Sequence, residues 1–311
     1  MSQTIAISPW RCWLKQHSLL AYFILAFSIS WLFELPVVLS HAGLGWLPYN
    51  VPPLLANSSP GVPLGPTGAA FILTALLEGK VGVMRLLKRY VQWRVSLKWY
   101  LLILLGSPLL MLLSASVFSA PHLQRLPFFL SSYSTHLLIA LAINWEEGGW
   151  RGFALPRLQK LAGPLWGSLI LGFMWGTWHL PLMFIPTQSP YGHTFTWALA
   201  LFFFMQIMAK SVNYTWIFNN TGGSLLMATL IHAATSINAH DIEQLFGATG
   251  ALMAQAEAAL AYGVLALLVI ALTRGTLSYP LQKAVLKDDK KLQEKDLMWP
   301  EDTTRRKERS R

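Results

Sequence analysis

The 311-residue sequence has one cysteine and unusually little charge. The single thiol, Cys12, excludes an intrachain disulfide and any metal cluster held by several cysteines. Charged residues make up 12% of the chain, whereas soluble domains carry about 25%. Hydrophobic residues make up 54%. A soluble protein with so few charges would be unable to cover its own surface, so the composition predicts an integral membrane protein.

Several apolar runs approach the roughly 20 residues that cross a bilayer as a helix. We therefore predict an all-α, polytopic fold of about eight transmembrane helices. The expected spans are Leu19–Ser40, Gly65–Leu77, Trp99–Ser119, Leu130–Trp150, Pro164–Ile185, Thr194–Phe218, Gly223–His240 and Ala256–Thr273. The second span is the shortest, and it begins nearer Val62 if Pro63 and Pro66 lie in its first turn.

The net charge of +10 is concentrated in alternate loops and in the C-terminal tail. The positive-inside rule predicts this pattern for cytoplasmic segments, and Arg125 is the exception on the opposite side. Eight spans with both termini in the cytoplasm account for the distribution. We expect a cytoplasmic segment over residues 1–18, a transmembrane domain over 19–275 and a disordered, charged tail over 276–311. The partners expected are a lipid bilayer and no nucleic acid.

Residues 81–95 alternate basic and apolar side chains. This pattern fits an amphipathic helix lying on an anionic leaflet. It fits a basic cytoplasmic loop equally well, and the sequence does not separate the two.

Residues 144–151 place two carboxylates and an arginine directly after an apolar run. Acidic residues in a membrane segment are costly and indicate a functional site. Neighbouring residues on a helix differ by about 100°, so Glu146 and Glu147 face different ways. Glu147 and Arg151 are four residues apart and are expected to pair along one face. This leaves Glu146 for chemistry, whereas Glu34 has no such companions and is interpreted as structural.

Two histidines lie in later spans. His179 follows Trp175 by four residues, so the two share a helix face. Gly172 and Gly176 form a small-xxx-small pattern that lets another helix approach closely. His232, in the seventh span, is followed four residues later by Ser236.

One carboxylate and two histidines on three neighbouring helices would support hydrolysis. A carboxylate acts on water as a general base, while a histidine orients that water or donates to a developing oxyanion. Glu146, His179 and His232 would also serve as ligands for Zn²⁺. Because no H-E-x-x-H motif is present, the sequence does not demand a metal, and the cofactor stays open between Zn²⁺ and none.

The three motifs, in this order on successive spans, resemble those of the CAAX protease and bacteriocin-processing (CPBP) family of intramembrane proteases. The family motif E-E-x-x-x-R is matched by Glu146, Glu147 and Arg151. The second motif, an aromatic residue and then histidine four later, is matched by Trp175 and His179, and the third, H-x-x-x-N, is matched by His232 but has Ser236 in place of asparagine. The resemblance covers about residues 80–237, with a motif core over 130–240.

The resemblance implies an eight-helix fold around a membrane-embedded catalytic cavity. It implies that Glu146 and His179 activate water and that His232 forms part of the oxyanion hole. Glu147, Arg151 and Trp175 then support the site. Ser236 is the departure, because a hydroxyl is shorter than an amide. The expected substrate is a membrane-associated peptide or protein segment, either prenylated at its C-terminus or a peptide precursor.

Two other functions stay open at the level of sequence. Ser236 is compatible with a weak or inactive member that binds a peptide, for example an immunity protein. Intramembrane Glu and His also fit a proton-coupled transporter, although no inverted repeat is found. We expect the protein in a bacterial inner membrane.

Overall fold

The computed structural model describes residues 9–53, 60–185, 195–236, 239–247 and 250–279. The chain divides into two units, residues 1–277 and 278–311, and almost all described residues belong to the first. The tail expected to be disordered lies outside the described residues, apart from Thr276–Tyr279. Every regular element among the described residues is helical, and no strand occurs there, in agreement with the predicted all-α class.

The first half of the chain forms the following helices: α1 (Pro9–Gln16), α2 (Ser18–Leu39), α4 (Gly61–Tyr90), α5 (Leu97–Leu101), η1 (Leu102–Gly106), α6 (Ser107–Ala115), η2 (Leu123–Arg125) and α7 (Leu126–Ile143). The second half forms α8 (Glu147–Gly149), η3 (Trp150–Ala154), α9 (Leu155–Ala162), α10 (Pro164–Trp178), η4 (Leu180–Phe184), α11 (Trp197–Asn220), α12 (Leu225–Thr235), α13 (Ala239–Phe246) and α14 (Ala251–Thr273).

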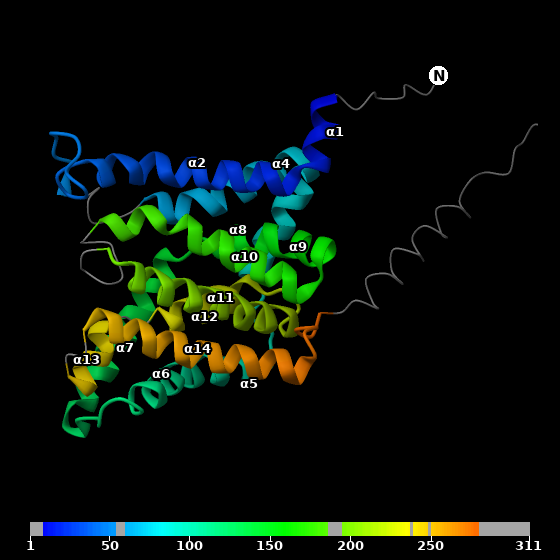
Figure 1. Ribbon diagram of the computed structural model, residues 1–311. Coiled ribbons are helices and arrows are strands. Elements are labelled where there is room, and N and C mark those ends of the chain that lie inside the picture. The colour runs from blue at the N-terminus through cyan, green and yellow to red at the C-terminus, as the bar shows by residue number, and fades with distance from the viewer. Residues whose placement is uncertain (1–8, 54–59, 186–194, 237–238, 248–249, 280–311) are drawn as a thin grey trace, which may run out of the picture. The chain divides into compact units, whose positions relative to one another are not determined.

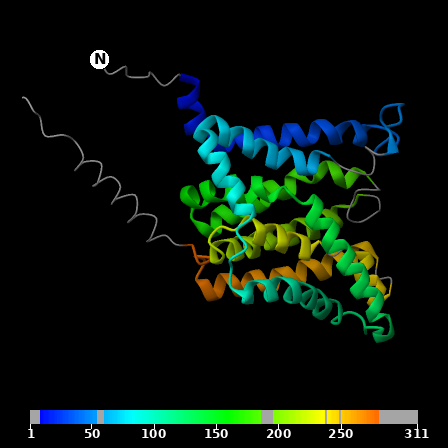
Figure 2. The same ribbon diagram turned by 180° about the vertical axis from the view of Figure 1, so that it is seen from behind.

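The long helices of the first unit run side by side (Figures 1 and 2). α2 packs on α4, α10 packs on α11, and α11 packs on α14. α10, α11 and α12 lie between the α2–α4 pair and the layer that contains α6 and α14 (Figure 1). The middle helices therefore have neighbours on both sides and can hold polar side chains away from the surface.

Apolar side chains cover much of the outer surface of the long helices. Leu32 is 72% exposed, Leu138 67% and Leu272 83%. Four helical runs among the described residues are long and apolar enough to cross a membrane, namely Ser18–Leu39, Leu97–Ala115, Leu123–Ile143 and Leu252–Thr273. The protein is thus an integral membrane protein, and these four runs correspond to the first, third, fourth and eighth predicted spans. The other four predicted spans stay predictions.

α4 changes direction in its middle. Gly79 has φ +65°, a value that glycine adopts without steric cost. The first part of α4 pairs with α2, and the second part crosses the ends of other helices (Figure 2). Residues 81–90, which the sequence left open between helix and loop, are helical.

The second part of α4 is tied to the segments that follow it. The Arg89 guanidinium donates to the carbonyl oxygen of Gly152 at 3.1 Å and to that of Gly223 at 2.8 Å. Gln92 donates to the Thr221 carbonyl oxygen at 3.1 Å. These bonds fix η3 and the start of α12 against the same end of α4.

Candidate active site

The predicted fourth span, Leu130–Trp150, is interrupted in the structure. α7 ends at Ile143, and Asn144 has φ −82° and ψ 63°, outside the helical region. A helix resumes at Glu147 and continues through a π-helical segment to Ala162. Thr67 and, at 3.0 Å, Tyr90 donate to the carbonyl oxygen of Trp145. Because these donors belong to α4, the interruption is stabilised by tertiary contacts that the local sequence does not reveal.

The two glycines after Glu147 permit a very close approach to the neighbouring helices. A Cβ atom on Gly149 would lie 2.4 Å from the Pro66 carbonyl oxygen and 2.4 Å from the Tyr22 hydroxyl. A Cβ atom on Gly148 would lie 2.0 Å from the Tyr90 hydroxyl. The glutamates are therefore held against α2 and α4 by backbone contact.

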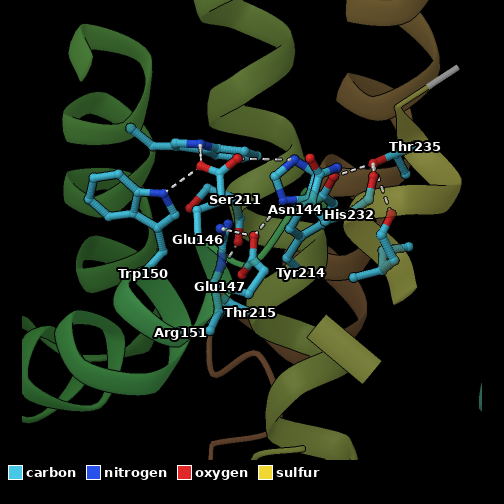
Figure 3. A network of polar contacts seen from close by, with 12 residues as sticks. Asn144, Glu146, Glu147, Trp150, Arg151, Ser211, Tyr214, Thr215, His232 and Thr235 are labelled. Carbon is cyan, nitrogen blue, oxygen red and sulfur yellow. Dashed lines mark hydrogen bonds and ion pairs between the residues drawn. The ribbon is translucent and has the colours of Figure 1, made fainter. Parts of the chain in front are cut away.

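Glu147 forms a fully buried ion pair with Arg151, as its spacing predicts. Arg151 Nη1 lies 3.0 Å from Glu147 Oε1, and both side chains are 0% exposed. The same Oε1 accepts from His232 Nδ1 at 2.8 Å. The Arg151 guanidinium also lies over the rings of Trp175 and Tyr214, 4.7 and 4.8 Å from their centroids. Glu147 and Arg151 thus orient His232 from below the site (Figure 3).

Glu146 faces away from Arg151, toward α10 and α12 (Figure 3). Its Oε2 atom accepts from two indoles, Trp150 Nε1 at 2.8 Å and Trp175 Nε1 at 3.1 Å. Its Oε1 atom lies 3.7 Å from His232 Nε2. One oxygen of Glu146 is therefore held by the protein, and the other is placed next to an imidazole.

His232 lies between the two carboxylates, with Nδ1 toward Glu147 and Nε2 toward Glu146. A carboxylate only accepts hydrogen bonds, so Nδ1 carries a proton. Nε2 is then also a donor only when the ring is an imidazolium. In that state the buried group of Glu146, Glu147, Arg151 and His232 has no net charge, which is the arrangement that buried charges require.

His179 ends α10 and faces the same space. Its Nδ1 donates to the Trp175 carbonyl oxygen at 2.8 Å, so the neutral ring keeps Nε2 as an acceptor. Trp175, Trp178 and Phe203 surround the ring, with centroids 5.8, 4.6 and 5.4 Å away. Gly172 and Gly176 allow α11 to pack closely here, since Cβ atoms on them would lie 2.9 Å from Ser211 Cβ and 2.8 Å from the Phe204 ring.

A cavity of about 360 Å³ connects these residues. Glu146, Trp175, His179, His232 and Ser236 all line it. The residues chosen for chemistry from the sequence therefore share one space. The cavity is also lined by Asn144, Gln206, Lys210 and Gln255, which the sequence analysis did not select.

Ser236 has no hydrogen left to donate into the cavity. Its hydroxyl donates to the His232 carbonyl oxygen at 2.8 Å and accepts from Asn144 Nδ2 at 3.3 Å. The residue that stands in place of the family's asparagine is thus bonded to its own helix on one side and to an asparagine from another segment on the other.

The side chains do not form a metal site in the described part of the chain. No group of three or more His, Cys, Asp or Glu there has metal-binding geometry. Oε2 of Glu146 accepts from two indoles, and Nδ1 of His232 donates to Glu147. These bonds leave Glu146 Oε1 and the Nε2 atoms of His179 and His232 uncommitted, as metal-ligating histidines also do, so it is the overall geometry among the described residues that does not fit Zn²⁺. The reaction proposed for this site uses only protein groups and water.

Comparison with known proteins finds two matches to this part of the chain. A family model described as Type II CAAX prenyl endopeptidase Rce1-like matches residues 132–237, which include all three motifs. The CAAX prenyl protease 2 of Methanococcus maripaludis is 29% identical over 187 residues, which cover 55% of this chain and 68% of that relative. Over this region the chain is similar to the CAAX prenyl endopeptidases of the CPBP family.

The CPBP resemblance seen in the sequence is therefore confirmed. Both matches are to CAAX prenyl proteases. Besides Gln206, Lys210 and Gln255, the sequence analysis missed Trp150 and Asn144 at this site. Trp150 was detectable, because it lies four residues after Glu146 and shares its face. Asn144 was not, because its partner is 92 residues away.

Proposed function

We propose that this protein is an intramembrane endopeptidase that hydrolyses a peptide bond of a membrane-associated substrate. The observation that carries the proposal is the position of Glu146. Glu146 lines a cavity with its Oε1 beside the His232 imidazole, while two indoles hold Oε2. A buried carboxylate with one accessible oxygen next to a cavity is suited to act as a general base.

In the proposed reaction, a water molecule lies between Glu146 Oε1 and His179 Nε2. Glu146 takes a proton from the water while the water oxygen attacks the carbonyl carbon of the substrate. The π electrons of that carbonyl group move onto the carbonyl oxygen. His232, as an imidazolium, donates from Nε2 to this oxyanion. When the C–N bond breaks, the nitrogen keeps the electron pair and takes the proton from Glu146. The products are a carboxylic acid and an amine.

The substrate is proposed to be a peptide or membrane-protein segment that reaches the cavity from the cytoplasmic leaflet. The Methanococcus relative is a CAAX prenyl protease, which supports a prenylated C-terminal peptide as the first substrate to test. The proposal includes eight membrane passes with both termini in the cytoplasm. A cavity of about 360 Å³ falls in the range of small-ligand sites, about 300–1,000 Å³.

The test compares hydrolysis of an internally quenched, farnesylated peptide by purified wild-type protein and by variants in proteoliposomes. We expect Glu146→Gln and His179→Asn to lose at least about 10²-fold in kcat, as is usual for loss of a general base. Glu34→Gln is the matched control, because Glu34 is also buried in a membrane helix but does not line the cavity. Full activity in Glu146→Gln would refute the proposal.

The same variants separate the other two functions. A peptide-binding protein without catalysis would bind the farnesylated peptide and leave it intact in every variant. A proton-coupled transporter would acidify proteoliposomes in a solute-dependent way and would not cleave the peptide. Glu146 contacts two indoles and an imidazole. These contacts fix the direction of its carboxylate, as a general base requires, and so favour the protease.

A further inference from the structure

The cavity has few hydrogen-bond donors that remain available for a developing oxyanion. The indoles of Trp150 and Trp175 donate to Glu146. The Ser236 hydroxyl donates to the His232 carbonyl oxygen. Lys210 Nζ donates to the Thr235 carbonyl oxygen at 3.0 Å. The two indoles and the hydroxyl therefore have no hydrogen left for an oxyanion, whereas the Lys210 ammonium keeps two further N–H groups and the Tyr262 hydroxyl, which also lines the cavity, has no hydrogen-bond partner among the described residues.

His232 alone is an incomplete oxyanion donor. Its Nδ1–H is directed at Glu147, so it offers a single hydrogen, at Nε2, and only as an imidazolium. Oxyanion holes of acyl-transfer enzymes present more than one donor to the developing charge, and loss of one costs about 10²–10³ in kcat. A second donor on the same wall of the cavity is needed.

Asn144 meets this requirement. It lines the cavity and is 9% exposed. An amide has two N–H groups, and one of them is directed at Ser236 Oγ. The other N–H has no recorded acceptor among the described residues. Asn144 lies two residues before Glu146, and its contact Ser236 lies four residues after His232 on the neighbouring helix, so its amide belongs to the same cavity as the proposed base and the proposed imidazole donor.

We propose that Asn144 is a catalytic residue that donates from Nδ2 to the oxyanion, so that the amide donor of this site comes from the break after α7 and not from position 236. This rests on the proposed hydrolytic function. Ser236 then has a positioning role, since its hydroxyl accepts one Asn144 N–H and turns the other toward the cavity. The Asn144 backbone supports the assignment, because its non-helical φ and ψ turn the residue out of the axis of α7.

An exchange of the two side chains tests the proposal. Asn144→Ser removes the amide, and Ser236→Asn in the same protein restores an amide from the opposite side of the 3.3 Å contact. We expect Asn144→Ser to lower kcat about 10²-fold with little change in KM, following the cost of a lost oxyanion donor. We expect the exchanged variant, Asn144→Ser with Ser236→Asn, to recover at least about tenfold of that loss.

The affinities for a substrate and for an analogue of the tetrahedral intermediate separate a catalytic role of Asn144 from a merely structural one. A phosphinate analogue of the farnesylated peptide imitates the tetrahedral intermediate, and the uncleaved peptide bound to Glu146→Gln protein reports the ground state. Asn144→Ser in the Glu146→Gln background is expected to bind the peptide as before. Asn144→Ser alone is expected to bind the phosphinate about 10²-fold more weakly than wild type.

The proposal is overturned if folded Asn144→Ser keeps kcat within about twofold of wild type, or if it loses peptide and phosphinate affinity equally. It is also overturned if the exchanged variant, with an unchanged thermal midpoint, is no more active than Asn144→Ser. Should Asn144→Ser not fold, Asn144→Ala is read in the same way. If wild-type protein and Glu146→Gln show equal activity, the proposed function fails, and this outcome is distinct from failure of the Asn144 assignment.

Discussion

The two oxygens of Glu146 have different surroundings. Oε2 is held by the indole N–H groups of Trp150 and Trp175, and Oε1 is left toward the cavity and His232. Hydrogen bonds to a charged group contribute about 1.5–3 kcal/mol each. Both indoles therefore stabilise the ionised base and fix the direction of its free oxygen.

Replacement of one indole should slow hydrolysis without removing it. We expect Trp175→Phe to lower kcat/KM about tenfold, because one N–H donor is lost while Trp150 still holds Glu146 Oε2. The double variant, Trp150→Phe with Trp175→Phe, should lose about 10²-fold, from roughly 1.5 kcal/mol per bond. Steady-state hydrolysis of the peptide measures both effects.

Trp178→Phe is the matched control for the loss of an indole. Trp178 is as buried as Trp150, but its Nε1 has no hydrogen-bond partner among the residues that the structure describes. Its replacement should change kcat/KM less than threefold. Equal losses in Trp175→Phe and Trp178→Phe would show that ring packing, and not the N–H groups, determines the effect.

At this scale the sequence identified side chains better than it identified their partners. Glu147 and Arg151 pair at the predicted i, i+4 spacing, because that contact is local. The bond of His232 to Glu147 spans 85 residues, and that of Asn144 to Ser236 spans 92. Such contacts depend on which helices become neighbours, and a single sequence does not specify this.

The interrupted pass from α7 to α9 is the element on which the site is built. If the helix continued through residues 144–146, both glutamates would lie on the extension of α7. The break instead offers the backbone at Trp145 to Thr67 and Tyr90, and Gly148 and Gly149 then pack directly on neighbouring helices. Both glutamates are placed by this docking.

A methyl group at Gly149 should disrupt the docking. We expect Gly149→Ala to lower the thermal midpoint in detergent and to reduce hydrolysis, because its Cβ would meet backbone of α4 at 2.4 Å and buried overpacking costs about 1–3 kcal/mol. Gly68→Ala is the control, since a Cβ there meets no atom within 4 Å. Alanine is favoured over glycine in a helix, so Gly68→Ala should leave the midpoint unchanged or raise it.

A lower midpoint in Gly68→Ala of the same size as in Gly149→Ala would contradict this account. The two thermal midpoints are to be measured in one detergent and at one protein concentration, so that the variants differ only in the position of the added methyl group.

Helix ends were harder to predict than helices. The predicted span Leu130–Trp150 was wrong at its C-terminal end, because the apolar pattern gave no sign that Asn144 leaves the helical region. α4 begins at Gly61, close to the alternative start at Val62 rather than at Gly65. Pro66 lies inside this helix, which is tolerated in membrane helices when neighbouring groups satisfy the backbone.

On the scale of the whole molecule, the apolar exterior and the distribution of basic residues both indicate a protein embedded in a membrane. Exposed leucines on the long helices meet the requirement of a lipid environment, and composition alone was enough to predict it. The orientation rests on charge. Cys12, the single cysteine, is exposed on α1 and provides a natural reporter for that orientation.

A maleimide that does not cross membranes should distinguish the two sides. We expect Cys12 to be labelled in inside-out vesicles and protected in sealed right-side-out vesicles, because basic residues flank it on the predicted cytoplasmic side. His41→Cys in a Cys12→Ser background is the control, since residue 41 is exposed after the other end of α2. It should show the opposite pattern, and labelling of both positions from the same side would contradict the predicted topology.

Arg89 connects the segments that bear the two halves of the site. Its guanidinium joins Gly152, five residues after Glu147, to Gly223, nine residues before His232. The segments that carry the glutamates and His232 are therefore both hydrogen-bonded to Arg89 of α4. If the protein hydrolyses peptides as proposed, a substrate that enters the cavity meets groups that are already positioned, so the binding energy it supplies is available for straining the scissile bond instead of assembling the catalyst.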